Sequence, residues 1–454
     1  MFKKVLIANR GEIAVRILSA CKELGIKTVA IFSLPDRGAL HARYADEAVC
    51  IGPAEPSASY LNIPAIISAA NITRAEAIHP GYGFLSENAE FSAECSKNGF
   101  AFVGPTSESL RLLGDKKLAC ITMAKMGLPV LPGAEFSVDT KQQRVAAAER
   151  IGFPLMVKSC HGGGGRGLRV VKDMSGLEKA WSMSSIEATA GFGSDRLYLE
   201  KYLVTARHIE FQFLADESGN VLHLGERECS IQYRHQKLIE ESPSVAISQE
   251  DRETLSWRIN SAAKDIGYRG AGTFEFVCDG DNRFYFLEVN PRLQVEHPVT
   301  EMVTGIDIVK EQIRIAFGDS LSWKQQDIEP RGHSIECRVN AENPATFMPS
   351  TGVISMIRLP GGEGPGVRVD SACEVGTEIT PYYDSLVAKI ITHGRNRSEA
   401  IARMRRALET AVIKGVDTTI PFHLEVLDQP DFLGGDIYTD FVHRMIEQRA
   451  RRSR

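Results

Sequence analysis

Two apolar segments joined by an acidic turn constrain the fold of this chain more than any other feature of its sequence. Residues 272–277 (GTFEFV) and 284–290 (FYFLEVN) alternate in character, and the segment DGDN at 279–282 separates them. Turn residues between two alternating apolar runs predict a β-hairpin. The part of the chain around it, from Leu203 to about Phe317, is predicted to be rich in strands.

The second strand of this hairpin carries polar residues at its end. Strict alternation would divide it into two faces, one with Phe284, Phe286, Glu288 and Asn290 and the other with Tyr285, Leu287 and Val289. The hairpin would also bring Glu275 near Glu288. Facing carboxylates repel unless a cation lies between them, and carboxylate and amide oxygens suit Mg²⁺. The sequence therefore predicts a metal site of Glu275, Glu288 and Asn290, with solvated edge-strand acids as the alternative.

Composition and charge exclude several classes of protein. The 454 residues are 43% hydrophobic, which is ample for buried cores, and the length favours two or more domains. A net charge of -5 argues against a nucleic-acid partner. Nine cysteines without a CxxC spacing fit reduced thiols in the cytosol. The first apolar run, residues 5–8, is too short for a signal peptide or a membrane span, so we expect a cytoplasmic protein without a membrane partner.

The N-terminal part is predicted to be a small parallel-sheet unit. An apolar run at residues 5–8 is followed by a loop, an apolar helical stripe (Ile13, Ile17, Cys21 and Leu24) and a second strand at residues 28–33. This order is typical of a βαβ unit. The first turn lacks the GxGxxG pattern, which disfavours a dinucleotide-binding domain.

Several motifs in one order carry a resemblance to a known family. The run EVNPRLQVEHP at residues 288–298 closely resembles the core of biotin carboxylases, which belong to the ATP-grasp superfamily. The similarity covers nearly the whole chain, through IANRGEIAVRI (7–17), HPGYGFLSEN (79–88), GDK (114–116), GGGGRG (162–167), RHQK (234–237), YRGAGTFEF (268–276) and ECRVNAE (336–342). Such a series is far more specific than any single motif.

The resemblance implies an α/β and α+β fold with the three-part ATP-grasp architecture. We expect an N-terminal parallel-sheet domain at residues 1–114 and an ATP-grasp domain at 115–317, with a mobile glycine-rich lid at about 131–202. A C-terminal, β-rich domain is expected at 333–440. The catalytic residues would lie in the central and C-terminal parts.

A glycine-rich segment in the expected lid predicts a phosphate-binding flap. Residues 162–167 contain GxGxxG, but strands predicted at 153–159 and 168–172 make this a hairpin rather than a strand-to-helix turn. Gly163, Gly164 and Gly165 would let backbone N–H groups approach phosphate oxygens, although a merely flexible hairpin has the same pattern. The chain departs from the family at Cys160-His161, before the flap, and we expect His161 to be tolerated there.

The resemblance assigns residues to an ATP site. Lys116 and Lys158 would contact the phosphates, and the segment with Glu200, Lys201 and Leu203 would receive the adenine. His208 and Glu210 lie on the polar face of one predicted strand, where a solvated face is equally compatible with the pattern, and the resemblance favours the nucleotide site. His235 and Lys237 belong to a charge-rich loop that matches the RHQK segment of the family.

The acid-guanidinium run gains roles from the same resemblance. Arg292 offers a planar fork for bicarbonate, Gln294 and the Val295 N–H can orient it, and Glu296 can take its proton. Arg338 would stabilise the ureido oxyanion of biotin, whereas a salt bridge to Glu336 is its structural alternative. The implied catalytic residues are thus Glu296, Arg338, Arg292 and Lys237, and the implied substrate-binding residues are Arg292, Gln294, Val295, Lys237 and Arg338. Tyr82, in a loop rich in proline and glycine, is a further candidate for substrate binding, and an ordinary turn is equally compatible with this loop.

The sequence is therefore interpreted as a biotin carboxylase subunit that uses ATP with Mg²⁺ or Mn²⁺. The segment MAKM at 123–126 permutes the biotin-accepting sequence of carrier domains, but it follows GDK on a predicted helix, so Lys125 is expected to be a surface lysine. Biotin would arrive in trans on a biotin carboxyl carrier protein. A carboxyltransferase, a homodimer and a place in acetyl-CoA carboxylase and fatty acid biosynthesis are further expectations. The alternatives are a ligase like carbamoyl-phosphate synthetase and a regulatory protein that has lost catalysis.

Overall fold

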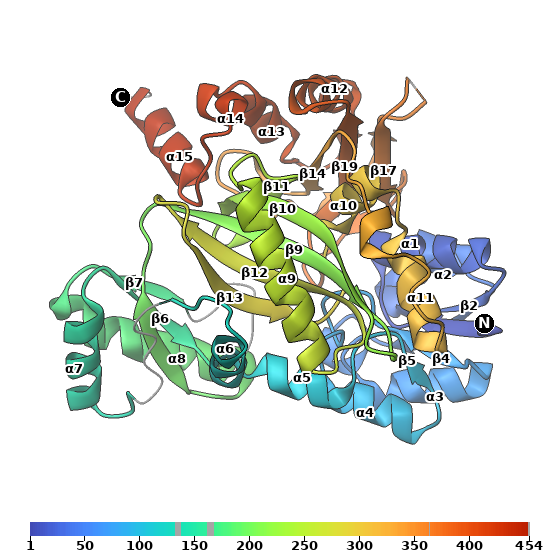
Figure 1. Ribbon diagram of the computed structural model, residues 1–454. Coiled ribbons are helices and arrows are strands. Elements are labelled where there is room, and N and C mark those ends of the chain that lie inside the picture. Colours follow the sequence, from blue (N-terminus) through green and yellow to red (C-terminus); the bar gives the residue numbers. More distant parts are fainter. Residues whose placement is uncertain (132–137, 161–167, 363, 453–454) are drawn as a thin grey trace.

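The computed structural model describes residues 1–131, 138–160, 168–362 and 364–452 (Figure 1). The predicted flap glycines Gly163, Gly164 and Gly165, and the predicted role of His161, lie outside the described residues. The described strands form an N-terminal sheet, a small sheet in the expected lid, one large sheet that carries the site, and two sheets of two strands each. None of the helices in the described ranges has the length and apolar character that a membrane crossing requires.

The N-terminal unit is a five-stranded parallel sheet of order β3-β2-β1-β4-β5. The predicted βαβ unit is confirmed, because β1 and β2 are parallel and α1 buries Ile13, Ile17 and Cys21 against the sheet. Its strands are β1 (Lys4–Ile7), β2 (Lys27–Ser33), β3 (Glu47–Gly52), β4 (Ala77–His79) and β5 (Ala101–Phe102). Its helices are α1 (Gly11–Glu23), α2 (Leu40–Tyr44), α3 (Ile63–Thr73), α4 (Ala89–Lys97) and α5 (Ser107–Gly114).

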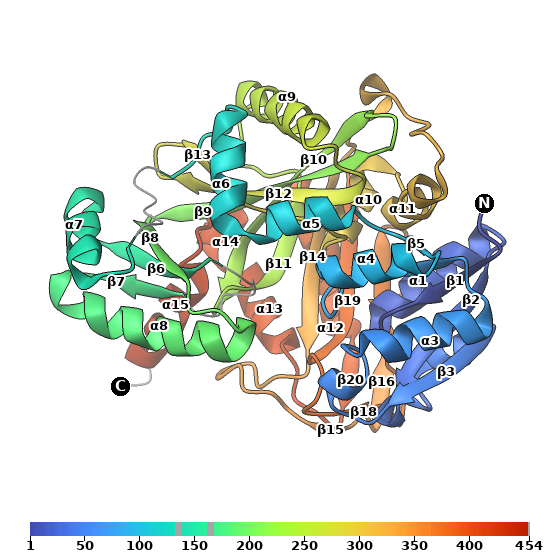
Figure 2. The ribbon, with the colours of Figure 1, turned by 90° about the horizontal axis from the view of Figure 1, so that it is seen from below.

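The lid region contains a three-stranded antiparallel sheet of order β7-β6-β8 with a core of its own. Its elements are α7 (Lys141–Ile151), β6 (Leu155–Ser159), β7 (Arg169–Val171), α8 (Leu177–Phe192) and β8 (Leu197–Lys201), and α6 (Lys116–Lys125) precedes them. Strands β6 and β7 pair antiparallel on either side of the glycine-rich segment, so the predicted hairpin is confirmed. Lys125 is exposed at the end of α6, as expected for a surface lysine. Figure 2 shows this unit and the N-terminal unit on opposite sides of the large sheet.

An eight-stranded antiparallel sheet of order β13-β12-β9-β10-β11-β14-β19-β17 forms the centre of the molecule. Its strands are β9 (Ala206–Ala215), β10 (Val221–Tyr233), β11 (Gln236–Ser242), β12 (Gly270–Asp279), β13 (Phe284–Asn290), β14 (His333–Asn340), β17 (Val367–Ser371) and β19 (Leu386–Gly394). The last three belong to the expected C-terminal domain, so one sheet continues from the central part into the C-terminal part. This continuity places side chains that are far apart in sequence on one surface.

Helices and small sheets complete the central and C-terminal parts. The helices are α9 (Gln249–Asp265), α10 (His297–Thr304), α11 (Ile308–Phe317), α12 (Arg397–Thr410), α13 (Ile420–Leu427), α14 (Pro430–Gly434) and α15 (Phe441–Arg452). Two-stranded sheets pair β15 (Gly352–Val353) with β18 (Glu378–Ile379), and β16 (Met356–Arg358) with β20 (Val412–Lys414). In Figure 1, α12 to α15 lie along the top of the view, above the large sheet.

The predicted hairpin of β12 and β13 is present, but the predicted division of β13 into two faces is wrong. Glu288 pairs with Glu275 and Phe286 with Phe276, so Leu287 is an extra residue, a β-bulge, on β13. The bulge reverses the alternation beyond it. The core therefore receives Phe284, Phe286 and Val289, while Glu288 and Asn290 leave on the opposite face. The predicted proximity of Glu275 and Glu288 is confirmed.

Candidate active site

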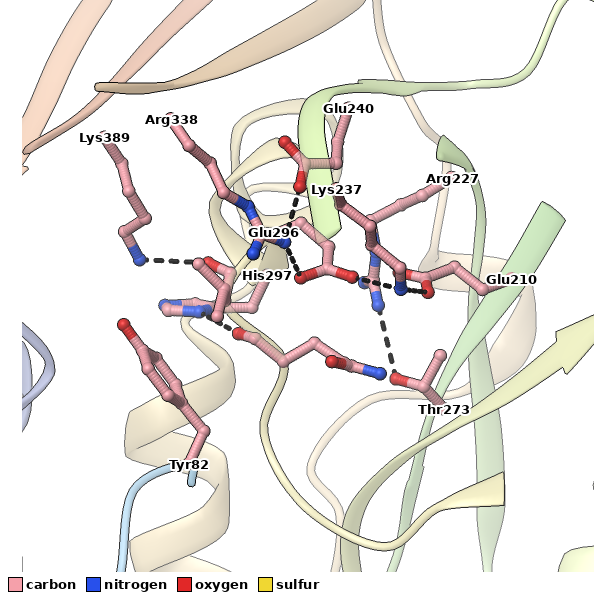
Figure 3. A network of polar contacts seen from close by, with 12 residues as sticks. Tyr82, Glu210, Arg227, Lys237, Glu240, Thr273, Glu296, His297, Arg338 and Lys389 are labelled. Carbon is pink, nitrogen blue, oxygen red and sulfur yellow. Dashed lines mark hydrogen bonds and ion pairs between the residues drawn. The ribbon is translucent and has the colours of Figure 1, made fainter. Parts of the chain in front are cut away.

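Lys237 lies at the centre of a buried cluster of carboxylates (Figure 3). Its ammonium donates to Glu210 at 2.5 Å, to Glu275 at 2.9 Å and to Glu296 at 2.6 Å. Burial alone would lower the pKa of Lys237, but the three acids around it raise that pKa well above its usual value. The predicted loop position is wrong for Lys237, which is part of β11, because the β10–β11 turn uses only Arg234 and His235.

Glu296 is the acid that two of the three predicted catalytic cations, Lys237 and Arg338, contact. It lies just before α10, and its two carboxylate oxygens accept from Lys237 at 2.6 Å and from Arg338 at 2.8 Å. Burial alone would raise the pKa of Glu296, but Lys237, Arg338 and Arg227 together hold it well below its usual value. A carboxyl group with a lowered pKa is ionised at neutral pH, which is the form that can accept a proton.

Arg338 does not form the salt bridge to Glu336 that was the alternative to its catalytic role. It pairs with Glu296 at 2.8 Å and with Glu240 at 2.5 Å. The carboxylate oxygens of Glu336 have no hydrogen-bond partner among the residues that the structure describes. Burial of Glu240 raises its pKa to about 7, although Arg338 lowers it. Arg338 is thus available to the site as a cation held between two acids.

Arg227 is a structural member of the cluster that was not predicted. It is fully buried on β10, directly opposite Glu210 on β9. Its guanidinium donates to Glu210 at 2.5 Å, to Gln212 at 2.8 Å and to Thr300 at 3.0 Å. The only signal in the sequence was an arginine at an inward position of a strand. Arg227 fixes Glu210 and so leaves one oxygen of Glu210 for Lys237.

Three of the residues predicted to bind substrate, Arg292, Gln294 and Val295, lie in the loop between β13 and α10. Arg292 donates to Gln294 at 2.8 Å and to Asn290 at 3.0 Å, and it pairs with Glu87 of the N-terminal unit at 2.5 Å. Gln294 in turn donates to Glu275 at 3.1 Å. A guanidinium and an amide group thus lie next to the carboxylate cluster.

The predicted metal ligands are brought together, and each already contacts another polar side chain. Glu275 contacts Lys237 and, at 3.1 Å, His208, while Glu288 pairs with Lys116 at 3.1 Å. The ligand atoms of His208, Glu210 and Glu275 lie within 4.8 Å of one another. The cross-strand carboxylates with the Asn290 amide oxygen fit a hard divalent cation, because such ions prefer oxygen donors. Glu275 and Glu288 together contact two lysines and a histidine, so the carboxylates make this part of the site strongly negative.

The predicted nucleotide residues include side chains on the lid strands β6 and β8, at the start of α6 and on the β10–β11 turn. Lys158 on β6 pairs with Glu200 on β8 at 2.7 Å, and both side chains are buried. Lys116 begins α6 and reaches Glu288. Lys201 instead donates to the carbonyls of Gly152 and Phe153, which ties β8 to the loop before β6. Leu203 follows β8, and His235 is exposed on the β10–β11 turn.

Tyr82 and two residues that were not predicted, His297 and Lys389, complete the site on the side of the N-terminal unit (Figure 3). The Tyr82 hydroxyl donates to Glu12, and the Lys389 ammonium lies 5.9 Å from the Tyr82 ring centroid. Lys389 also donates to the Val295 carbonyl at 2.9 Å. These contacts bring the N-terminal unit to the substrate loop.

Three family models match consecutive parts of the chain. They describe the N-terminal domain of biotin carboxylase (residues 1–110), the ATP-binding domain of the carbamoyl-phosphate synthase L chain (115–324) and the C-terminal domain of biotin carboxylase (336–444). The biotin carboxylase of Allochromatium vinosum is 53% identical over 447 residues, which cover 98% of this chain and 99% of that protein. The chain belongs to the biotin carboxylase family. Biotin carboxylase 1 of Bacillus subtilis is 52% identical over 444 residues, which cover 97% of this chain and 98% of that protein.

Solved structures of the biotin carboxylase family share the whole fold. The biotin carboxylase domain dimer of the Hydrogenobacter thermophilus 2-oxoglutarate carboxylase, solved with MgADP, ADP and bicarbonate, has a TM-score of 0.95 at 47% identity and covers 98% of each chain. A biotin carboxylase complex from Campylobacter jejuni has the same TM-score at 46% identity, covering 98% of this chain and 99% of that one. The ATP-grasp architecture predicted from the motifs is thereby confirmed.

Proposed function

We propose that this protein catalyses the ATP- and bicarbonate-dependent carboxylation of biotin on a separate biotin carboxyl carrier protein. The observation that carries the proposal is the ionised Glu296 carboxylate held between Lys237 and Arg338. A carboxylate placed between two cations is a base in its proton-accepting form, and the two cations can bind anionic substrates on either side.

The first step is the phosphorylation of bicarbonate. Arg292 and the Val295 N–H bind bicarbonate, and Glu296 takes its proton while a bicarbonate oxygen attacks the γ-phosphorus of ATP. ADP leaves, and carboxyphosphate is formed. A divalent cation held by Glu275, Glu288 and Asn290 would neutralise phosphate charge during this transfer. In the proposed step, Lys116 and Lys158 leave Glu288 and Glu200, with which they pair in the structure, and contact the phosphates.

The second step is carboxylation of biotin. Carboxyphosphate decomposes to CO₂ and phosphate, the phosphate removes the proton from the ureido nitrogen, and that nitrogen attacks CO₂. Once Glu296 is protonated, it loses its charge and binds Arg338 less tightly. Arg338 can then turn its positive charge to the ureido oxyanion, where a preorganised cation in a dry site is most effective. The pairing of Arg338 with Glu296 thus links the two half-reactions.

Partners and physiological role are part of the same proposal. We infer a homodimer, a carrier protein and a carboxyltransferase in an acetyl-CoA carboxylase of fatty acid biosynthesis, acting in the cytoplasm and with Mg²⁺ or Mn²⁺. Support comes from relatives of nearly the same length that are named biotin carboxylase. A pyruvate carboxylase component of Methanothermobacter thermautotrophicus, at 51% identity, makes pyruvate the competing acceptor. The domain limits 1–114, 115–317 and 333–440, with the lid at about 131–202, remain predictions.

The test is the release of phosphate from ATP by purified protein with Mg²⁺ and bicarbonate, with and without free biotin. The proposal expects faster release when biotin is added. The match to the ATP-binding domain of carbamoyl-phosphate synthase makes a bicarbonate-phosphorylating, ammonia-using ligase the second candidate. Stimulation by ammonia and not by biotin would favour that candidate. A protein that binds ATP but never turns it over would be a regulatory protein.

A further inference from the structure

Two buried side chains hold the backbone of the loop that is proposed to bind bicarbonate. His297, the first residue of α10, places its Nδ1 atom 2.8 Å from the Gln294 carbonyl oxygen. Lys389, on β19, donates to the Val295 carbonyl at 2.9 Å. Both side chains are completely buried, so their polar groups were removed from water to make these contacts. The carbonyls of Gln294 and Val295, which follow each other in the loop, are therefore each held by a buried side chain.

The contact at Gln294 determines the protonation state of His297. A backbone carbonyl only accepts hydrogen bonds, so the Nδ1 atom must carry a proton. Burial, together with the charges of Lys389, Arg16 and Arg368, holds the pKa of His297 well below its usual value. The ring is therefore a neutral imidazole with its proton on Nδ1. Its Nε2 atom has no hydrogen-bond partner in the described ranges and lies 3.9 Å from a carboxylate oxygen of Glu301, too far for a hydrogen bond.

The contact at the Gln294 carbonyl also fixes the direction of the Val295 N–H. The Gln294 carbonyl and the Val295 N–H belong to one planar trans peptide, so they point in opposite directions. An acceptor already engaged by a donor also polarises the N–H of the same unit and makes it a stronger donor. The Val295 N–H has no acceptor among the residues described, and Val295 is only partly buried. It is thus free to bind an anion.

Lys389 connects this loop to the rest of the sheet and to the N-terminal unit. It lies directly across from Arg338 on β14 and from Asp370 on β17. Its ammonium is 3.2 Å from Glu12, the residue that accepts from the Tyr82 hydroxyl. Burial alone would lower the pKa of Lys389, but the charges of Glu12, Glu336 and Asp370 raise it, so the ammonium stays charged. A charged donor makes a stronger hydrogen bond to the Val295 carbonyl than a neutral one.

We propose that His297 and Lys389 are positioning residues that aim the Val295 N–H at the substrate bicarbonate. His297 fixes and polarises the peptide that carries this N–H, and Lys389 fixes the next peptide, which leads to Glu296. Neither side chain touches the reacting atoms. The inference rests on the proposed function, since it concerns the bicarbonate site of that reaction.

The test compares the KM for bicarbonate with the KM for ATP in four variants. His297→Leu and Lys389→Met remove the two donors, and each should raise the KM for bicarbonate roughly tenfold or more, as expected for loss of a buried hydrogen bond, with the KM for ATP within about twofold of wild type. His297→Asn retains a donor near Nδ1 and should restore most of the affinity. Thr392→Val, which removes a buried hydrogen bond to Ala400 elsewhere on β19, is the matched control and should leave both KM values unchanged.

The outcomes separate this inference from the proposed function. An unchanged bicarbonate KM in His297→Leu, or an equal increase in Thr392→Val, would overturn the positioning role while wild-type activity still supports the function. ATP cleavage by the wild-type protein that ignores bicarbonate would overturn both. If Lys389→Met does not fold, the comparison of His297→Leu with His297→Asn decides the question alone.

Discussion

Replacing Glu296 by glutamine tests the proposed base, because glutamine keeps the shape of the side chain and removes its charge. Glu296 is fully buried and contacts Lys237 at 2.6 Å and Arg338 at 2.8 Å. The amide cannot take a proton from bicarbonate. Turnover should therefore fall by roughly 10²–10⁴, the usual contribution of a general base, while the KM for ATP stays near that of wild type.

The structure also sets the expected cost in stability. Removing one partner of a buried ion pair costs about 3–5 kcal/mol when the other charge is left alone. Here Lys237 keeps Glu210 and Glu275, and Arg338 keeps Glu240. Neither cation becomes unpaired, so we expect a loss of only about 1–3 kcal/mol. The variant should fold.

The loss of stability in Glu296→Gln should depend on pH. The folded-state pKa of Glu296 is below the unfolded value, so its contribution is present above the unfolded pKa and disappears as the pH falls through the folded pKa. The difference in unfolding free energy between wild type and Glu296→Gln should therefore shrink in acid.

Glu228 provides a matched control with the opposite sign. Burial of this carboxyl raises its pKa to about 7, although Ser230 and Arg207 lower it. Its stabilisation is therefore lost as the pH rises from the unfolded pKa to about 7. Relative to wild type, Glu228→Gln should gain up to about 3 kcal/mol across that window, with normal turnover. Denaturant unfolding at several pH values and steady-state phosphate release measure both effects. Near-normal turnover in Glu296→Gln, with Glu228→Gln also normal, would refute the assignment of the base.

The same contacts lead to three further predictions. Arg338→Gln should impair formation of carboxybiotin more than bicarbonate-dependent ATP cleavage, and an equal loss of both would make Arg338 a structural residue or a nucleotide contact. Chelation of divalent cations should abolish ATP cleavage, and added Mg²⁺ or Mn²⁺ should restore it; activity that survives chelation would remove the proposed metal site at Glu275 and Glu288. Lys125→Ala should leave turnover unchanged, and the wild-type chain should not bind streptavidin after exposure to a biotin ligase, because Lys125 lies on a helix; biotinylation there would contradict this.

In the β12–β13 hairpin, the local sequence pattern predicted which residues pair but not which face each side chain occupies. Turn chemistry and alternation predicted the pairing of Glu275 with Glu288, because both signals are local. The bulge at Leu287 could not be predicted, because the sequence alternates without a break from Phe284 to Asn290 and gives no sign of an extra residue. The alternation therefore predicted the wrong face for Glu288 and Asn290, although it placed them correctly at the strand end.

The buried cations of the large sheet could not be predicted from the local sequence pattern. Arg227 donates to Thr300 and Lys389 donates to the Val295 carbonyl, partners that lie 73 and 94 residues away in the sequence and come close only when the chain is folded. The strand position of Lys237 was missed for a related reason, since a charged segment resembles a solvated loop until its acids surround it. Such residues are recognised from the sheet order and not from spacing.

The most direct test of the account follows the carbon of bicarbonate. The purified protein is incubated with Mg·ATP, biotin and isotopically labelled bicarbonate, and labelled carboxybiotin and ADP are measured together. We expect label in carboxybiotin, with at least one ADP formed for each carboxyl group, and loss of the label in Glu296→Gln. ADP formation at the same rate with and without biotin, and no label in biotin, would contradict it.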